Sequence, residues 1–207
     1  MEANGTVRSA CYDMLIFGKA AALLGGKVRT MFTGSAPIDK QVIDFLKICF
    51  SCPIQEGYGL TESSASGCIS AVEDTVTGHI GGPNESVILR LKDLPEMNYN
   101  STDKPYPRGE LCMKGPILFA GYFDNPEKTR DSYDSEGWFL TGDVVTIFPN
   151  GSIKIIDRSK NIFKLSQGEY IAPEKIEGIM CLSNFIAQCL VYGNSLKNSV
   201  VSIVIPD

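Results

Sequence analysis

Apolar residues near the start of the chain recur with the spacing of a helix and then of short strands. Residues 38, 42, 45, 46 and 49 are apolar, which predicts a helix over 38–50. Another apolar stretch, 9–24, predicts a helix that ends at two glycines. Shorter apolar runs predict strands at 27–33 and 54–56. This order of strand, turn, helix and strand predicts a parallel sheet whose ligand loops follow the carboxyl ends of the strands.

After Pro83 the pattern changes to short strands separated by turns. Strands are predicted at 87–91, 110–114, 143–148 and 152–157, with a polar surface loop over 95–108. The sequence Pro-Asn-Gly at 149–151 predicts a hairpin turn. One helix is predicted to begin here, with Asn125 as its cap, Pro126 in the first position and Glu127 in the first turn. We therefore expect residues 83–157 to form a small antiparallel β unit.

The last fifty residues read as the start of another domain. A basic, polar stretch from Arg158 leads to a helix that opens at 172–174, and apolar runs follow at 187–192 and 200–205. Because the last predicted strand is apolar and lacks a continuation, we expect a fragment of a longer protein. The predicted fold class is α/β, with a parallel-sheet part at 1–82, the β unit at 83–157, and an incomplete small α/β domain at 158–207.

Composition narrows the functional classes. The chain has 43% hydrophobic and 21% charged residues and a net charge of −5, with lysine and arginine scattered, so disorder, nucleic-acid binding and a polybasic membrane patch are not expected. The most apolar early stretch, 14–24, is too short to cross a bilayer, so a membrane anchor is expected only outside this chain. Seven cysteines, an odd number, favour a reducing compartment and a cytoplasmic location. Because His79 is the only histidine, a Ser-His or Cys-His nucleophilic centre is excluded unless His79 itself takes part in it.

The segment QEGYGLTE at 55–62 carries the strongest chemical signal. Gly57 and Gly59 lack a Cβ, so a ligand can approach the backbone and meet the ring of Tyr58. Stacking of a base on such a ring contributes ~1–3 kcal/mol. Thr61 and Glu62 add the hard oxygen ligands that a magnesium ion shared with phosphates requires. The alternative is a glycine-rich turn around a buried tyrosine.

Other loops carry weaker signals. Backbone N–H groups of TGSAP at 33–37 and the Ser35 hydroxyl could grip a nucleotide edge, or the loop could only turn the chain. Asp143 ends GWFLTGD and could accept hydrogen bonds from both ribose hydroxyls, or it is a turn aspartate. Arg158 closes IIDR with a planar fork for ribose or phosphate oxygens, or forms a surface ion pair.

The segment SKNIFKLSQGEY at 159–170 is the last candidate. Lys160 and Lys164 lie four residues apart and are followed by Gly168 and Glu169. They could form a cationic, flexible entrance for a phosphorylated thiol carrier, or an ordinary solvated face.

Taken in order, five segments identify a resemblance: TGSAP, EGYGLTE, GELCMKGP, GWFLTGD and IIDRSKNIFKLSQGEYIAPEKIE. The chain resembles the adenylate-forming superfamily of acyl-CoA synthetases, luciferases and nonribosomal-peptide adenylation domains, and within it the long-chain fatty acid–CoA ligases. The resemblance covers nearly the whole chain. It implies that a fatty acid attacks the α-phosphate of ATP to give acyl-AMP and pyrophosphate, and that the thiol of coenzyme A then displaces AMP.

The resemblance also implies a role for each motif residue. Tyr58 would stack on adenine, Thr61 would contact phosphate and Glu62 would hold Mg²⁺. Asp143 and Arg158 would hold the ribose, and Lys160 would be the hinge between half-reactions. The adenine pocket would be lined by Gly34, Ser35, Ala36, Pro37, Glu56, Gly57, Tyr58 and Gly59, and the face that meets coenzyme A by Lys164, Gly168 and Glu169.

The chain departs from the family pattern in four places. It has no Gly/Ser/Thr-rich phosphate loop before TGSAP and no catalytic lysine near the C-terminus. Leu140 stands where a histidine is common, and Ser159 where a basic residue is common. Two alternatives therefore stay open: an adenylation domain that loads a carrier protein, and a non-catalytic remnant that binds nucleotide. For the full-length protein, attachment to the cytosolic face of the endoplasmic reticulum or another organelle is the alternative to a cytoplasmic location.

Overall fold

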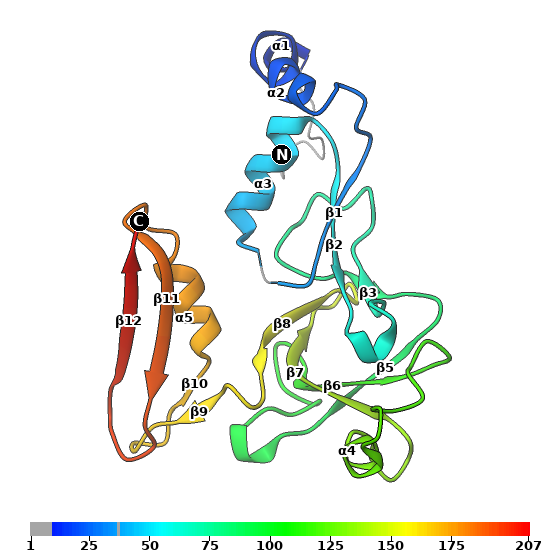
Figure 1. The fold of residues 1–207 in the computed structure, drawn as a ribbon, viewed down its shortest axis with the longest axis vertical. Coiled ribbons are helices and arrows are strands. Elements are labelled where there is room, and N and C mark those ends of the chain that lie inside the picture. The colour runs from blue at the N-terminus through cyan, green and yellow to red at the C-terminus, as the bar shows by residue number, and fades with distance from the viewer. Residues whose placement is uncertain (1–9, 37) are drawn as a thin grey trace. The chain divides into compact units, whose positions relative to one another are not determined.

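The computed structural model describes residues 10–36 and 38–207 (Figure 1). These residues divide into two compact units. The first unit takes in the described residues up to 88 together with 114–131 and 149–154. The second takes in 89–113, 132–148 and 155–207. Helices and several separate sheets occur together, so the predicted α/β class is confirmed.

A four-stranded sheet lies at the centre of the first unit. Its strand order is β1-β2-β3-β4, with bounds β1 Met31–Thr33, β2 Ile54–Tyr58, β3 Cys68–Ile69 and β4 Gly82–Pro83. β1 and β2 are parallel, with Met31 opposite Ile54, as the sequence predicts. The predicted strand over 27–33 is too long, because its partner β2 begins only at Ile54 and pairing therefore starts at Met31.

Helix α3, Lys40–Phe50, connects β1 to β2. It starts two residues later than the predicted Ile38, because Asp39 is the N-cap and its side chain accepts a 2.7 Å hydrogen bond from the backbone N–H of Gln41. Ser51 ends the helix in a left-handed conformation, with φ of 51°. Ile43 and Lys47, one turn apart, are the buried residues of this helix.

The N-terminal helical segment is not one regular α-helix. It consists of α1 Ala10–Tyr12, a π-helical turn η1 at Asp13–Phe17, and α2 Gly18–Leu23. A Cβ on Gly18 would lie 2.6 Å from the carbonyl oxygen of Asp13, so the wider turn needs a glycine here. The predicted single helix over 9–24 is therefore interrupted, and Ser9 lies outside the described residues.

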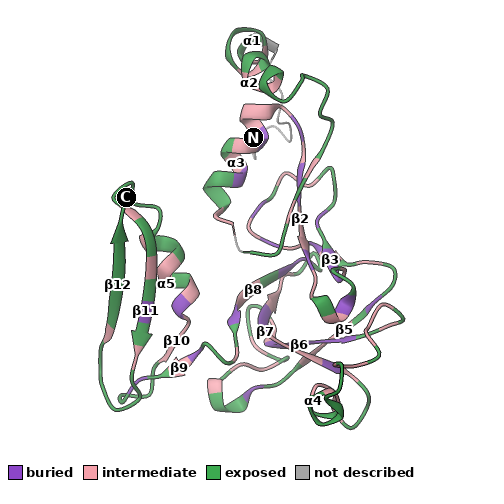
Figure 2. Cartoon of the chain, viewed as in Figure 1, coloured by how far each residue is buried: buried purple, intermediate pink, exposed green. Residues whose placement is uncertain are grey.

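The β unit is a four-stranded sheet, most of which belongs to the second unit. Its order is β5-β6-β7-β8, with bounds β5 Ile88–Lys92, β6 Arg108–Lys114, β7 Phe139–Ile147 and β8 Ile153–Arg158. β6 and β7 are antiparallel, and their register shifts between Glu110 and Cys112. The side chains that this pair buries completely are Leu111, Cys112, Met113, Val144 and Val145, so the core of the unit lies here (Figure 2).

Short helical turns and one helix accompany the sheets. The turns are η2 Thr61–Ser63 and η3 Pro95–Met97, and helix α4 is Pro126–Asp131. Asn125 caps α4 as predicted, since its Oδ1 accepts a 3.0 Å hydrogen bond from the backbone N–H of Lys128.

The C-terminal part of the second unit contains two hairpins and a helix. Strands β9 Phe163–Lys164 and β10 Tyr170–Ile171 form one hairpin, α5 is Pro173–Met180, and β11 Ile186–Gly193 pairs antiparallel with β12 Val200–Pro206. Most of β12 is exposed (Figure 2). Over residues 10–36 and 38–207, no helix combines the length and the apolar character needed to cross a bilayer.

Candidate functional site

The carboxyl ends of β1 and β2 bring two predicted site segments together. The loop after β1 begins with Gly34, and a Cβ on this residue would lie only 3.0 Å from the carbonyl oxygen of Gly57 in β2. Ser35 has a φ of 70°, and Gly34, Ser35 and Ala36 are all exposed. Pro37 lies outside the described residues. Parallel pairing thus places the TGSAP loop against the strand that carries Glu56 to Tyr58.

β2 ends at Tyr58, and Gly59 begins a tightly folded turn. Tyr58 exposes only 9% of its surface, so most of its ring is packed within the protein. A Cβ on Gly59 would overlap the backbone of Ala65, which folds back to donate a 2.8 Å hydrogen bond to the carbonyl of Leu60. The prediction that Gly59 lacks a Cβ so that a ligand can approach is therefore corrected: its close neighbour is the chain's own turn.

Glu62 is held by an aromatic residue that the sequence analysis did not identify. Its Oε1 accepts a 2.6 Å hydrogen bond from the hydroxyl of Tyr122, and its backbone oxygen accepts one of 2.8 Å from Phe119. Tyr122 is in turn fixed by a 2.9 Å hydrogen bond from its backbone N–H to Thr129. The only sequence signal for Tyr122 is a glycine before it, as in EGYG, which is too common to be specific.

A magnesium ion fits Glu62 only together with phosphate. Within the part of the chain that the structure describes, no three histidine, cysteine, aspartate or glutamate side chains cluster as a metal site. Mg²⁺ is commonly held by one or two carboxylates plus substrate phosphates. Glu62, with the exposed hydroxyl of Thr61 next to it, matches that donor set. The residues therefore suit an ion that arrives with a nucleotide.

Glu56, in β2, belongs to a largely buried polar network. Its Oε1 accepts a 3.1 Å hydrogen bond from the backbone N–H of Gly78. Lys47, only 3% exposed, donates a 3.1 Å hydrogen bond to the carbonyl oxygen of Asp74. Burial lowers the pKa of Lys47, although nearby carboxylates such as Glu56 and Asp74 act in the opposite direction. Burial likewise raises the pKa of Glu56, although the Gly78 hydrogen bond opposes the shift.

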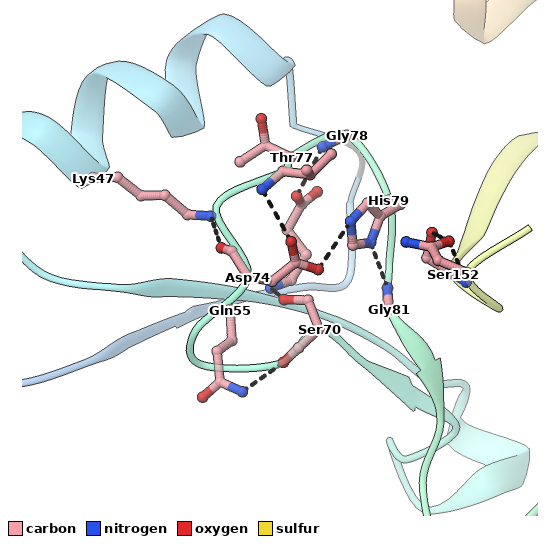
Figure 3. Close-up of polar contacts among 12 residues, drawn as sticks. Lys47, Gln55, Ser70, Asp74, Thr77, Gly78, His79, Gly81 and Ser152 are labelled. Carbon is pink, nitrogen blue, oxygen red and sulfur yellow. Dashed lines mark hydrogen bonds and ion pairs between the residues drawn. The ribbon is translucent and has the colours of Figure 1, made fainter. Parts of the chain in front are cut away.

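His79 connects two other residues of this network, Gly81 and Asp74. Its Nδ1 accepts a 3.0 Å hydrogen bond from the backbone N–H of Gly81, which leaves the ring proton on Nε2. Nε2 lies 3.2 Å from Oδ2 of Asp74 (Figure 3). Thr77 donates a 2.7 Å hydrogen bond to Asp44 in α3. His79 is therefore a buried residue that holds a turn.

In the second unit, Asp143 and Arg158 form the pair that the sequence analysis assigned to a ribose. Asp143 lies in β7 and Arg158 ends β8, and Nε of Arg158 is 3.2 Å from Oδ1 of Asp143. The Asp143 side chain is 4% exposed and the Arg158 side chain 60%. A buried acceptor beside an open guanidinium can meet a polar ligand with both hydrogen-bond acceptors and donors. We call Asp143 and Arg158 the ribose pair, after the role that the resemblance predicts for them.

Asp157, next to the ribose pair, is a second residue that the sequence analysis left without a role. It is completely buried and accepts hydrogen bonds from the backbone N–H groups of Arg158, at 2.6 Å, and of Glu174, at 3.2 Å. Glu174 lies in the first turn of α5. Burial raises the pKa of Asp157. The sequence signal that could have identified Asp157 is its position directly before Arg158 at the end of a strand.

The residue predicted as the hinge and those predicted to meet coenzyme A follow at 160–169. Lys160 is exposed in the turn after β8. Lys164 lies in β9, where its Nζ is 5.1 Å from the ring centre of Tyr170. Gly168, with φ of 97°, makes the turn between β9 and β10, and Glu169 follows it. The structure thus brings Lys164, Gly168 and Glu169 together on one exposed hairpin.

Comparison with known families places the chain in one of them. The model of the family described as AMP-binding enzyme matches residues 6–123, more than half of the chain. The chain therefore belongs to the AMP-binding enzyme family.

Particular relatives extend the similarity over almost the whole sequence. The chain is 51% identical over 206 residues to long chain acyl-CoA synthetase 7, peroxisomal, of Arabidopsis thaliana, covering 99% of the chain and 29% of that protein. It is 46% identical over 205 residues to long-chain-fatty-acid–CoA ligase 1 of Homo sapiens, again covering 99% of the chain and 29% of the relative. The chain thus spans less than a third of the length of these relatives.

The fold is similar to that of solved adenylation domains. One is the A domain of carboxylic acid reductase from Segniliparus rugosus, solved in complex with AMP and a co-purified carboxylic acid. It has a TM-score of 0.81 and 34% identity, over 97% of this chain and 30% of that structure.

Proposed function

We propose that this chain is part of an AMP-forming long-chain fatty acid–CoA ligase. The full-length protein would join a fatty acid to ATP as an acyl-adenylate, release pyrophosphate, and transfer the acyl group to coenzyme A. The observation that carries the proposal is the 51% identity to a long chain acyl-CoA synthetase over 99% of this chain. The buried Asp143 beside the exposed Arg158 supports it independently, because it suits a sugar with two hydroxyls.

In this proposal each motif binds one part of the nucleotide. Gly34 to Pro37 and Glu56 to Tyr58 line the adenine pocket, and Tyr58 stacks on the base. The ribose pair accepts and donates hydrogen bonds to the sugar. Thr61 contacts phosphate, and Glu62 holds Mg²⁺, which would neutralise phosphate charge when bound. Burial keeps Tyr58 and Asp143 in place before the nucleotide arrives, so little ordering accompanies binding.

The second half-reaction needs a different set of residues. ATP phosphates and the thiol of coenzyme A approach one carbonyl carbon from incompatible sides, so a domain rotation is expected. We propose the boundary at 157/158, with the large domain over 1–157 and the small mobile domain from 158, and with Lys160 as the hinge. Lys164, Gly168 and Glu169 would then face coenzyme A. The phosphate loop and the catalytic lysine of the family would come from other parts of the full-length protein, which we propose acts in the cytoplasm or on the cytosolic face of an organelle membrane.

Isotope exchange between pyrophosphate and ATP tests the proposal in the full-length protein. Exchange should rise well above background when a long-chain fatty acid is added, because only the carboxylate completes the reversible adenylation step. A series of saturated fatty acids of increasing chain length serves as the set of substrates. If no acyl length stimulates exchange while AMP still binds, the chain is a nucleotide-binding remnant and the proposal is wrong.

A further inference from the structure

The register of β6 and β7 changes abruptly at two of the sequence motifs. Glu110 pairs with Val144, but Cys112 pairs with Leu140. One residue of β6 therefore faces three residues of β7, Thr141 to Asp143. Gly142, in the middle, has a φ of 75°. We call residues 141–143 the bulge, and such irregularities commonly aim a side chain near an active site.

Glu110, in the GELCMKGP motif, fixes the middle of the bulge. Its Oε1 accepts a 3.1 Å hydrogen bond from the backbone N–H of Gly142. Its Oε2 lies 3.7 Å from Nζ of Lys92. Glu110 is only 7% exposed, and a carboxylate that deeply buried is costly unless it is paired and hydrogen-bonded. The Gly142 N–H and the Lys92 ammonium supply those partners.

Two further hydrogen bonds fix the ends of the bulge. The Thr141 hydroxyl donates a 2.7 Å hydrogen bond to the carbonyl of Leu111 in β6 and accepts one of 3.1 Å from the backbone N–H of Asp143. The carbonyl of Gly142 accepts a 2.8 Å hydrogen bond from the backbone N–H of Ser159.

The ribose pair is attached directly to this bonded frame. Asp143 follows Gly142, and Arg158 precedes Ser159, so the backbone of Gly142 is bonded through its N–H to Glu110 and through its carbonyl to the residue after Arg158. The distance between Asp143 and Arg158 therefore depends on the position of the Gly142 backbone. Glu110 helps to fix this position, since its carboxylate is the acceptor of the Gly142 N–H.

We propose that Glu110 is a positioning residue for the ribose pair: through Gly142 it holds the bulge so that Asp143 is aimed at the sugar hydroxyls of the nucleotide. The inference rests on the proposed ribose role of Asp143 and adds a residue that does not itself touch the ligand.

The test compares AMP with 2′,3′-dideoxy-AMP by calorimetric titration of the chain. Glu110→Ala leaves the half-buried Gly142 N–H without its acceptor, so the bulge loses its fixed geometry. AMP should bind about tenfold more weakly, which corresponds to ~1.4 kcal/mol. Dideoxy-AMP, which lacks the hydroxyls, should change less than about twofold because no sugar contact is lost.

Two control variants separate positioning from general damage. Glu110→Gln retains an oxygen that accepts the Gly142 N–H and should bind AMP like the wild type. Glu96→Ala removes an exposed glutamate of the same unit and should also have no effect. If Glu110→Ala does not fold, Glu110→Asp replaces it, because the shorter side chain withdraws the acceptor and keeps the charge.

A double-mutant cycle with Asp143→Ala decides between a positioning and a structural role. Once Asp143 is absent, Glu110→Ala should not weaken AMP binding further. Additive losses would overturn the inference, and so would equal losses for AMP and dideoxy-AMP in Glu110→Ala.

Failure of the proposed function gives a different result. If Asp143→Ala weakens both nucleotides equally, or if the wild type binds no AMP, the ribose role is wrong. In either case, amide hydrogen exchange still tests the positioning step. The Gly142 amide should exchange at least about tenfold faster in Glu110→Ala than in the wild type or Glu110→Gln, since opening is easier by ~1.4 kcal/mol. An unchanged exchange rate would overturn the inference.

Discussion

Removing the buried carboxylate of Asp157 should weaken the connection between β8 and α5. In Asp157→Ala, the backbone N–H groups of Arg158 and Glu174 lose the acceptors they meet at 2.6 and 3.2 Å. A buried donor left without a partner costs ~1–3 kcal/mol. Part of this cost is offset, because the substitution also removes a carboxylate whose charged form is disfavoured by burial. The raised pKa of Asp157 reflects that burial. With both contributions, we expect a net loss of about 2–4 kcal/mol in the free energy of unfolding.

Urea unfolding followed by tryptophan fluorescence measures this loss. The chain has a single tryptophan, Trp138, which belongs to the same unit as Asp157. Lys175→Ala, at an exposed position of α5, is the control and should change stability by less than ~0.5 kcal/mol. Amide exchange at Glu174 should accelerate in Asp157→Ala only. A variant as stable as the control would refute the helix-anchoring role.

The pH dependence of Asp157→Asn provides an independent check. Because the folded-state pKa of Asp157 lies above its ordinary value of 3.8, the folded chain takes up the proton before the unfolded chain as the pH falls. The stability of the wild type relative to Asp157→Asn should therefore rise as the pH falls from neutral towards 3.8. A relative stability that falls over this interval would contradict the burial of the charge.

Three further predictions concern the first unit. Gly59→Ala should destabilise the chain by ~1–3 kcal/mol, since its Cβ would overlap the backbone of Ala65, and urea unfolding that matches the wild type would contradict this. Burial raises the pKa of Glu56, so wild-type stability relative to Glu56→Gln should rise as the pH falls towards 4.5; a constant difference would be inconsistent with that shift. Tyr122→Phe removes the 2.6 Å hydrogen bond to Glu62 and should weaken Mg²⁺-dependent ATP binding by ~0.5–1.5 kcal/mol while leaving AMP binding unchanged; equal losses for both would dismiss a role in metal binding.

Local signals in the sequence predicted the elements that depend on local chemistry. The cap of α4 at Asn125 and the turn at 149–151 are set by residues within a few positions of each other, and both are found where expected. The parallel pairing of β1 with β2 also follows, because a helix separates them and α3 has the expected stripe. The strand predicted over 27–33 was too long because its length depends on a partner in another segment.

The polar contacts that organise the candidate site could not be predicted in this way. Tyr122 and Glu62 are 60 residues apart, and Glu110 accepts its hydrogen bond from a glycine 32 residues later. Nothing in GELCMKGP indicates that its glutamate points into a bulge, because the alternation of side chains along a strand does not reveal where the pairing register shifts. The π-helical turn at 13–17 was missed for a similar reason, as apolar spacing alone does not distinguish turn types.

Motif order, in contrast, grouped residues that the structure brings together, while their chemical roles stay predictions. Asp143 and Arg158, which the resemblance assigns to one ribose, are 3.2 Å apart, although each alone has an ordinary alternative as a turn acid or a surface cation. The hairpin that carries Lys164, Gly168 and Glu169 was likewise recognised only as part of the ordered set.

Titration of the isotope-labelled chain with AMP, observed through its backbone amide signals, tests the nucleotide-binding claim most directly. With AMP, the signals of Gly57 to Gly59 and those of Gly142 to Asp143 should shift together with one common dissociation constant. Dideoxy-AMP should shift the first group and leave the second almost unmoved. Signals of Gly142 and Asp143 that do not respond to AMP, or respond equally to both nucleotides, would contradict it.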